Sequence, residues 1–362
     1  MGSAAELPVG APGWRSLLVV SLDCRPVRGV TRLALSEGRG EAPRARGLRT
    51  RRYAGIVESI GDTPTVEIPR LAPNPNVRLF AKLEAANPTG SVKDRVARAL
   101  VEDLESSGRL RPGSILLEAT SGNTGIALAM IGRRKGYRVA VVMPDNVTLE
   151  RRQLVALHGA EIIDSPGALG SNGAIALARD LVARDPQFVM ADQYANPANP
   201  RVHEETTGPE VLEAVPELDV FVAGLGTGGT LTGVGRFLRR AKPGVRIVAA
   251  EPLPGDSVQG LRSLDDGFVP EVFDPSLLDD RYVVSNRDAV TTARELLELE
   301  GILAGPSSGA VLWVAARVAS EMPAGTIVAL LPDGGWKYLS TGTYSRPLDE
   351  MEDELEGGVA WW

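Results

Sequence analysis

The stretch SILLEATSGNTGIALAMIGRRKGYRVAVVM, residues 114–143, contains the structural unit that repeats along this chain. Residues 114–118 form an apolar run typical of a buried strand, and residues 138–143 form a second one. Between them, residues 124–134 have the apolar spacing of a helix, which follows the glycine-rich turn 120–125. Such alternation is typical of parallel strands covered by helices.

The alternation continues on both sides of this stretch. We expect further strands at residues 77–83, 161–164, 189–192, 220–223, 247–251 and 327–331. We expect further helices at residues 91–104, 149–157 and 171–184. The first of these helices carries Ser91 and Asp94 at the spacing of a capping box. The sequence therefore predicts an α/β fold with mostly parallel sheets, in which ligands bind beyond the carboxyl ends of the strands.

Composition narrows the possible functions. The 362 residues carry a net charge of −7, so we expect neither a nucleic acid nor a membrane as a partner. No apolar run reaches the roughly 18 residues that a membrane-spanning helix needs. Cys24 is the only cysteine, and His158 and His203 are the only histidines, which leaves no internal disulfide and little for a metal site. We expect a metal-free protein in a reducing, cytoplasmic compartment.

The two ends differ from the rest of the sequence. Residues 1–52 hold ten arginines and four acidic residues without a sustained period, and we expect them to be a disordered extension. Residues 348–362 are acidic and end in Trp361 and Trp362. We expect this tail to be solvated or to fold over a ligand site as a lid.

A second glycine-rich turn runs Gly224-Leu-Gly226-Thr-Gly228-Gly229, between an expected strand and an expected helix. It fits the dinucleotide pattern G-x-G-x-x-G, and Glu251 closes the next strand as that pattern requires. A glycine loop at a helix N-terminus equally offers its free N–H groups to any phosphate. The turn therefore indicates a phosphate and leaves open whether it belongs to a dinucleotide.

Two other turns have more than one interpretation. The segment Gly305-Pro-Ser307-Ser-Gly309 fits the nucleophile elbow of α/β-hydrolases, but no histidine follows His203 to complete that triad, and Ser307 could instead cap a helix. The turn at 120–125 offers hydroxyl, amide and backbone donors at a helix start, which suits a carboxylate but also makes an ordinary turn.

Lysine is scarce, with five residues against 34 arginines. Lys82 lies in an expected strand, Lys135 and Lys242 have surface contexts, and Lys337 follows a Gly-Gly-Trp turn without a clear role. Lys93 lies in the first turn of a helix directly after a strand, where a partly desolvated amine is favoured in its neutral, nucleophilic form. An amine, a phosphate loop and a carboxylate turn together describe a pyridoxal phosphate (PLP) enzyme that acts on an amino acid.

Residues 53 to about 345 resemble the fold-type-II PLP family of cysteine synthases and cystathionine β-synthases. The resemblance is carried, in order, by Gly61-Asp-Thr-Pro64, Asn87-Pro-Thr-Gly-Ser-Val-Lys-Asp-Arg95, Thr120-Ser-Gly-Asn-Thr-Gly125, Asn196-Pro-Ala-Asn199, Gly226-Thr-Gly-Gly-Thr230 and Gly305-Pro-Ser-Ser-Gly309. Within the family, the chain is most similar to the actinobacterial O-phosphoserine sulfhydrylases of the cysteine synthase B type.

The resemblance implies a tryptophan synthase β-like fold, with two open α/β domains, mostly parallel sheets and PLP in the cleft between them. Residues 53–92 and 191–347 would form the larger, PLP-binding domain, and residues 93–190 the smaller, mobile one. The family usually forms homodimers, so a homodimer is expected here too.

The resemblance also implies roles for single residues. Lys93 would hold PLP as a Schiff base and act as the catalytic base, Asn123 would bond the 3′-oxygen of the ring, and Ser307 would meet the pyridine nitrogen. The phosphate would be held by Gly226, Thr227, Gly228, Gly229 and Thr230. The substrate carboxylate region would be bound by Thr120, Ser121, Thr124 and Gln193. Arg262 would bind the leaving phosphate.

The sequence departs from the family pattern at three positions. Asp62 stands where Asn is common, and Thr65 stands where the family has an aliphatic residue. Pro306 stands in place of the aliphatic residue that the family has before the serine at position 307. None of these changes removes a proposed functional group, but Pro306 leaves the orientation of Ser307 open.

The implied reaction is a β-replacement by a transferase that forms L-cysteine. The β-substituent of O-phosphoserine, or of O-acetylserine, would leave to give an aminoacrylate, to which a sulfur donor adds. Sulfide or a thiocarboxylated carrier protein could be the donor. A serine at the ring nitrogen makes a weaker electron sink than an aspartate and suits prompt elimination. The alternatives are cystathionine β-synthase, 2,3-diaminopropionate synthase, serine/threonine dehydratase and, outside this fold, an NAD-dependent dehydrogenase.

Overall fold

The computed structural model describes residues 51–254, 256 and 258–351. The expectations for residues 1–50 and for the tail beyond residue 351, including its role as a lid, lie outside the described residues. In the part of the chain that is described, no helix is long and apolar enough to cross a membrane.

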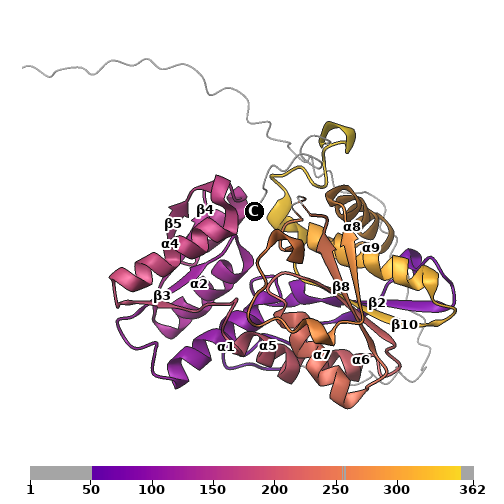
Figure 1. Cartoon of the computed structure of the whole chain (residues 1–362), viewed down its shortest axis with the longest axis horizontal. Helices are drawn as coiled ribbons and strands as arrows, with labels where there is room; N and C mark the ends of the chain where they lie inside the picture. Colours follow the sequence, from indigo (N-terminus) through magenta and orange to yellow (C-terminus); the bar gives the residue numbers. More distant parts are fainter. Residues whose placement is uncertain (1–50, 255, 257, 352–362) are drawn as a thin grey trace, which may run out of the picture. The chain divides into compact units, whose positions relative to one another are not determined.

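The described strands form two sheets (Figure 1). A six-stranded sheet has the order β1-β2-β10-β7-β8-β9, and a four-stranded sheet has the order β5-β4-β3-β6. The bounds are β1 Thr65–Glu67, β2 Val77–Leu83, β3 Ile115–Ala119, β4 Arg138–Pro144, β5 Glu161–Ser165, β6 Phe188–Met190, β7 Val220–Gly224, β8 Arg246–Pro252, β9 Asp280–Val284 and β10 Gly325–Leu331. Every pairing is parallel except that of β1 with β2.

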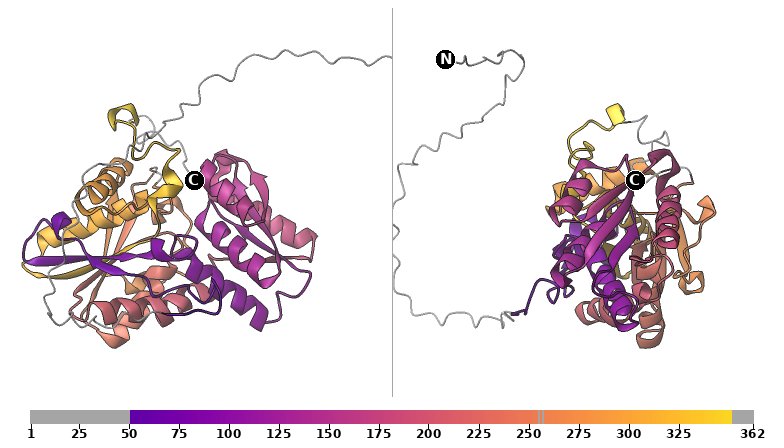
Figure 2. Two further views of the ribbon diagram at one scale, coloured as in Figure 1. Left: turned by 180° about the vertical axis from the view of Figure 1, so that it is seen from behind. Right: turned by 90° about the vertical axis from the view of Figure 1, so that its left-hand side faces the viewer.

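Helices cover both faces of each sheet (Figures 1 and 2). Their bounds are α1 Lys93–Ser106, α2 Asn123–Lys135, α3 Leu149–Leu157, α4 Gly170–Arg184, α5 Ala198–Val202, α6 Gly208–Ala214, α7 Gly229–Ala241, α8 Asn286–Glu300 and α9 Pro306–Glu321. Two short elements also matter for the site, the π-helix η4 His203–Thr207 and the 3-10 helix η7 Gly335–Tyr338. Helix α1 lies between the two sheets and contacts both α2 and α5.

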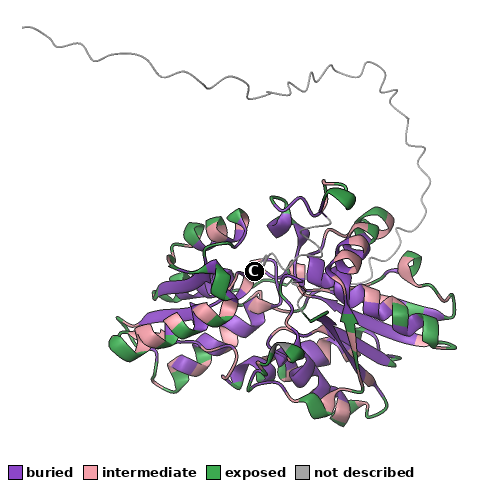
Figure 3. Cartoon of the chain, turned by 45° about the horizontal axis from the view of Figure 1, so that its top comes forward, coloured by how far each residue is buried: buried purple, intermediate pink, exposed green. Residues whose placement is uncertain are grey.

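The central strands are apolar and have both faces buried (Figure 3). In β7, Val220 and Val222 pack in the core on the α9 side, while Phe221 and Ala223 pack on the α7 side. This alternation follows from the two-residue period of a strand, whose successive side chains point to opposite faces. In β3, Leu116 packs toward α2, while Leu117 packs toward α4. Each sheet is therefore the middle layer of three.

The predicted fold class is confirmed, with corrections at single elements. The strand at residues 77–83 and the helix at residues 149–157 have the predicted bounds, and the others differ by one or two residues at one or both ends. The predicted capping box is wrong, because α1 begins at Lys93 and the carboxylate of Asp94 accepts hydrogen bonds from the backbone N–H and hydroxyl of Thr89. Asp62 has φ +48, a left-handed conformation that Asn and Asp tolerate better than most residues.

The topology brings the predicted motifs to one place. Lys93 follows β2, the turn at 120–125 follows β3, Gln193 follows β6, and the glycine loop follows β7. All of them come after the carboxyl ends of parallel strands, where α/β folds bind ligands. The division into a larger and a smaller mobile domain stays a prediction.

Candidate active site

A cavity of about 90 Å³ brings together most of the predicted site residues. The members that line it are Lys93, Thr120, Ser121, Asn123, Thr124, Gln193, Gly226, Thr227, Arg262 and Ser307. An adjoining cavity of about 30 Å³ shares Lys93 and Gly226 with it and adds Gly228 and Thr230. Gly229 lines neither cavity and begins α7. We call the two together the site cavity.

Lys93 is the amine of the site cavity. It begins α1, and its backbone N–H donates to the hydroxyl of Ser91 at 3.3 Å. Desolvation lowers the pKa of Lys93 from its usual value, while the carboxylates of Asp333 and Glu84 act in the opposite direction. A lowered pKa increases the fraction of neutral amine, which is the form that attacks a carbonyl.

The glycine loop forms a cradle of backbone donors. Among the described residues, no acceptor takes the N–H groups of Gly226, Thr227 or Gly228. Gly228 has φ +78, which favours glycine, and a Cβ on Gly226 would lie 2.8 Å from the carbonyl oxygen of Gly260. The loop thus presents free N–H groups at the start of α7, where the helix dipole also favours an anion.

His203 supports this cradle, a role that no sequence motif indicated. Its Nε2 lies 3.3 Å from the hydroxyl of Thr230, and its Nδ1 lies 2.9 Å from the hydroxyl of Thr207. Burial lowers the pKa of His203 well below its usual value, with Arg95 and Lys93 contributing in the same direction. The imidazole is therefore neutral and orients Thr230 without adding charge.

The turn after β3 is held by its own side chains. The hydroxyl of Thr120 accepts from the N–H of Gly122 at 3.2 Å. The hydroxyl of Thr124 donates to Oε1 of Gln193 at 2.7 Å, and this glutamine donates to the carbonyl of Ala119 at 3.4 Å. The turn is fixed at the start of α2, where donors face the site cavity and suit a carboxylate.

Ser307 lies in the first turn of α9 and is 2% exposed. The alternative in which Ser307 caps this helix is wrong, because Gly305 occupies the N-cap position and Pro306 takes the first helical position that proline favours. The Ser307 hydroxyl faces Gly260, so that a Cβ added there would be 3.6 Å away. Pro306 therefore leaves the hydroxyl directed at the site cavity.

Arg262 lines the site cavity and packs against two aromatic rings, Tyr194 and Phe268, which contact each other edge to face with their centroids 5.6 Å apart. Its guanidinium carbon is 5.5 Å from the ring centroid of Tyr194 and 4.7 Å from that of Phe268. Its Nη1 is 3.5 Å from Oδ1 of Asn172, and no carboxylate among the described residues forms an ion pair with it. The stacking orders a guanidinium that remains available for an anionic group.

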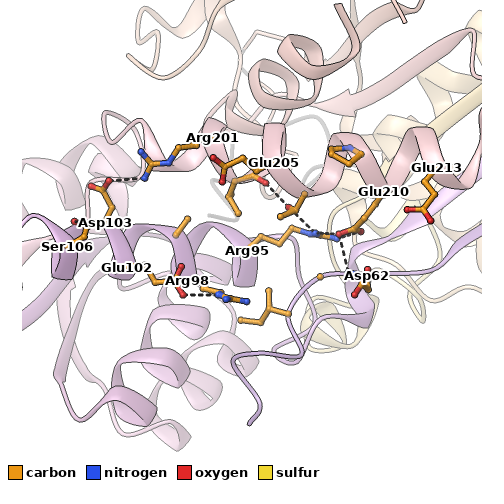
Figure 4. Close-up of a pocket in the computed structure, with 16 residues that line it drawn as sticks. Asp62, Arg95, Arg98, Glu102, Asp103, Ser106, Arg201, Glu205, Glu210 and Glu213 are labelled. Carbon is orange, nitrogen blue, oxygen red and sulfur yellow. Dashed lines mark hydrogen bonds and ion pairs between the residues drawn. The ribbon is translucent and has the colours of Figure 1, made fainter. Parts of the chain in front are cut away.

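Another cavity, of about 690 Å³, lies elsewhere (Figure 4). None of the predicted site residues lines it. Its charged side chains pair with one another: Arg95 with Glu210 at 2.6 Å, and Arg98 with Glu102 at 2.9 Å. Arg95 also binds Glu84 at 2.8 Å and is 1% exposed, so it anchors α1, the helix that Lys93 begins. We therefore place the chemistry in the smaller cavity.

The donor set fits PLP. An amine, a cradle of free N–H groups and a hydroxyl in the same cavity match an aldehyde, a phosphate and a ring nitrogen. The dinucleotide alternative lacks its ribose-binding carboxylate, because Glu251 is buried, pairs with Arg281 at 2.8 Å and accepts from the N–H of Leu264 at 3.1 Å.

Other polar groups near the site were missed. Arg151 lines the site cavity with its guanidinium 4.9 Å from the ring centroid of Tyr338. Lys337 and Asp333 both bond Asn123. Arg151 belongs to no glycine-rich motif. Asp333 and Lys337 flank a Gly-Gly pair after β10, but only the folded chain shows their contact with Asn123.

The chain is similar to known proteins over most of its length. A family model for pyridoxal-phosphate dependent enzymes matches residues 56–333. Cysteine synthase B of Escherichia coli (strain K12) is 43% identical over 292 residues, which are 80% of this chain and 96% of that protein. The crystal structure of O-ureido-L-serine synthase is 41% identical, has a TM-score of 0.77, and covers 83% of this chain and 99% of its own. That of a cysteine synthase from Entamoeba histolytica is 36% identical, has a TM-score of 0.76, and covers 85% and 97%.

The family match includes both the amine at Lys93 and the glycine loop at residues 226–230. The chain therefore belongs to the pyridoxal-phosphate dependent enzymes of fold type II, and it is cysteine synthase-like in sequence and in structure.

Proposed function

We propose that this enzyme forms L-cysteine by β-replacement on O-phosphoserine. The observation that carries the choice of substrate is Arg262, whose guanidinium lines the site cavity and packs against the rings of Tyr194 and Phe268. A guanidinium binds a phosphate dianion through paired, charge-assisted hydrogen bonds, whereas a neutral acetyl ester offers it no charge.

Lys93 is the proposed catalytic base. When bound, PLP supplies the electron sink that stabilises negative charge at the Cα atom of the substrate. The lowered pKa of Lys93 lets its amine take the Cα proton and return it after the sulfur has added at Cβ. Asn123 and Ser307 would hold the ring, and the N–H groups at residues 226–230 its phosphate.

The substrate carboxylate has a matching partner in the turn after β3. Thr120, Ser121 and Thr124 would bind it together with Gln193, whose amide is fixed by Thr124 and by the carbonyl of Ala119. This arrangement leaves the β-substituent to be met by another group, and Arg262 lines the same cavity.

The nucleophile is the less constrained half of the proposal. We propose sulfide or a thiocarboxylated carrier protein as the sulfur donor, and a cytoplasmic homodimer as the working form. One solved relative is an O-ureido-L-serine synthase. The product assay must therefore detect products other than cysteine.

The test is a product assay on the purified enzyme with O-phosphoserine or O-acetylserine, each in the presence of sulfide. We expect kcat/KM for cysteine formation to be larger with O-phosphoserine, with one phosphate released per cysteine. A clear preference for O-acetylserine would refute the substrate. Phosphate release without cysteine would refute β-replacement by sulfide.

A further inference from the structure

Lys337 is a buried cation that the proposed reaction does not use. It lies in η7 and is 0% exposed. Its Nζ donates to Oδ1 of Asn123 at 2.7 Å and to the carbonyl oxygen of Gly90 at 3.2 Å. A buried ammonium is costly unless its donors are satisfied, so these contacts define where the side chain lies.

Asp333 completes the contacts of the same amide. Its Oδ2 accepts from Nδ2 of Asn123 at 2.7 Å and from the hydroxyl of Tyr338 at 2.6 Å, and Asp333 is 0% exposed. Asn123 therefore has a cation on its oxygen and an anion on its nitrogen. The opposite amide orientation would direct the NH2 group at the ammonium and the carbonyl at the carboxylate, so the two charges fix one orientation.

This orientation leaves one donor free. An amide nitrogen carries two N–H groups, and Asp333 takes one of them. Asn123 also lines the site cavity beside Lys93 and Ser307. We propose that Lys337 and Asp333 are positioning residues that hold the Asn123 amide so that its second N–H can donate to the phenolic oxygen of PLP. The inference rests on the proposed role of Asn123.

The surrounding charges support a protonated Lys337 at neutral pH. Burial lowers the pKa of Lys337 to about 8. Asp333 and Asp94 act in the opposite direction, and Arg151 and Lys93 act in the same direction as burial. The ammonium thus keeps its proton near pH 7. It acts through Asn123, because its nearest polar contacts are that amide and the Gly90 carbonyl.

The test compares Lys337→Met, Lys337→Gln and the control Lys135→Met by the visible spectrum of bound PLP and the PLP dissociation constant. Lys135 is an exposed lysine paired with Glu105 at 2.7 Å, so its variant should match the wild type. Methionine cannot donate to Asn123, so we expect Lys337→Met to shift the visible band of bound PLP and to raise the PLP dissociation constant roughly ten-fold or more. Glutamine keeps an N–H donor, and we expect a spectrum close to that of the wild type.

Asn123→Ala separates the two levels of the argument. If Asn123→Ala leaves the band unchanged, the proposed role of Asn123 is wrong, and the inference is overturned with it. If Asn123→Ala shifts the band but Lys337→Met does not, only the inference is overturned. In the double variant, Lys337→Met should add no further shift to Asn123→Ala, and additive shifts would contradict action through Asn123. Should Lys337→Met fail to fold, a Lys337→Gln spectrum as shifted as that of Asn123→Ala overturns the inference.

Discussion

Replacing Arg262 by methionine should separate the two candidate substrates. Methionine keeps an unbranched apolar side chain against Tyr194 and Phe268 but removes the guanidinium that we propose for the leaving phosphate. The loss of stacking can loosen this segment for either substrate. The informative quantity is therefore the ratio of the kcat/KM values for O-phosphoserine and O-acetylserine.

The expected size follows from the environment of Arg262. The side chain is half-buried, and a hydrogen bond to a charged group contributes about 1.5–3 kcal/mol. At about 1.4 kcal/mol for each factor of ten, kcat/KM for O-phosphoserine should fall roughly 10- to 150-fold. The neutral ester loses no charged pair, and we expect its kcat/KM to change by less than about threefold.

The assay measures cysteine formation by the wild type, Arg262→Met and Arg184→Met with each substrate. Arg184 is an exposed arginine that pairs with Asp180 at 2.9 Å within α4, and its variant should behave as the wild type. Arg262→Lys keeps the charge without the planar guanidinium, so its kcat/KM for O-phosphoserine should lie between those of the wild type and Arg262→Met. Equal losses on both substrates in Arg262→Met would show that Arg262 only supports the fold, and the substrate assignment would then lose its basis.

Three further predictions concern the amine, the anchor of α1 and a buried carboxyl group. Lys93→Ala should abolish turnover and the visible absorption band of bound PLP, and a variant that keeps the band would refute the assignment. Arg95→Met should lower the free energy of unfolding by roughly 3–5 kcal/mol, because it leaves Glu84 buried without its cation. Arg98→Met on the same helix should lower it by less than about 0.5 kcal/mol. Similar losses for the two variants in denaturant titrations would contradict this prediction. Burial raises the pKa of Glu118 from 4.5 to about 8, so the stability from its protonated form is present below pH 4.5 and is lost as the pH rises through 8. Glu118→Gln should lose this component of the pH dependence, and parallel stability curves from pH 4.5 to 9 would count against it.

The fold could be predicted from the sequence wherever a strand is buried on both faces. The strands β3, β4 and β7 read as continuous apolar runs because helices cover them on either side. The sequence analysis missed β1 and β9, which are the two edges of the six-stranded sheet. β1 has three residues, and the sequence of β9 is Asp-Arg-Tyr-Val-Val, which is polar at its start. Edge strands are short and polar because they face solvent on one side.

The site could be predicted as far as its residues follow a strand end in a glycine-rich turn. That signal identified Lys93, the turn at 120–125 and the glycine loop, which line one cavity. Lys337 also follows a strand end and a Gly-Gly turn, but the signal does not show its role. Lys337 lies 214 residues from Asn123 and meets it only because β10 and β3 end at the same cavity. Contacts between distant segments depend on the arrangement of the two sheets, and a local pattern carries no information on that arrangement.

The scarcity of lysine has a chemical meaning at this site. In the role that we propose for it, Arg262 needs a permanent, planar charge to bind an anion, and arginine supplies it because it does not lose its proton in proteins. In its proposed role, Lys93 must lose its proton to attack a carbonyl and to act as a base, which an arginine cannot do. Lys337 only has to donate to Asn123, and its pKa of about 8 leaves it protonated at neutral pH. Replacing lysine by arginine should therefore have different effects at the two positions. Lys93→Arg should be as inactive as Lys93→Ala. Lys337→Arg should keep the spectrum of bound PLP if the longer side chain still reaches the Asn123 oxygen.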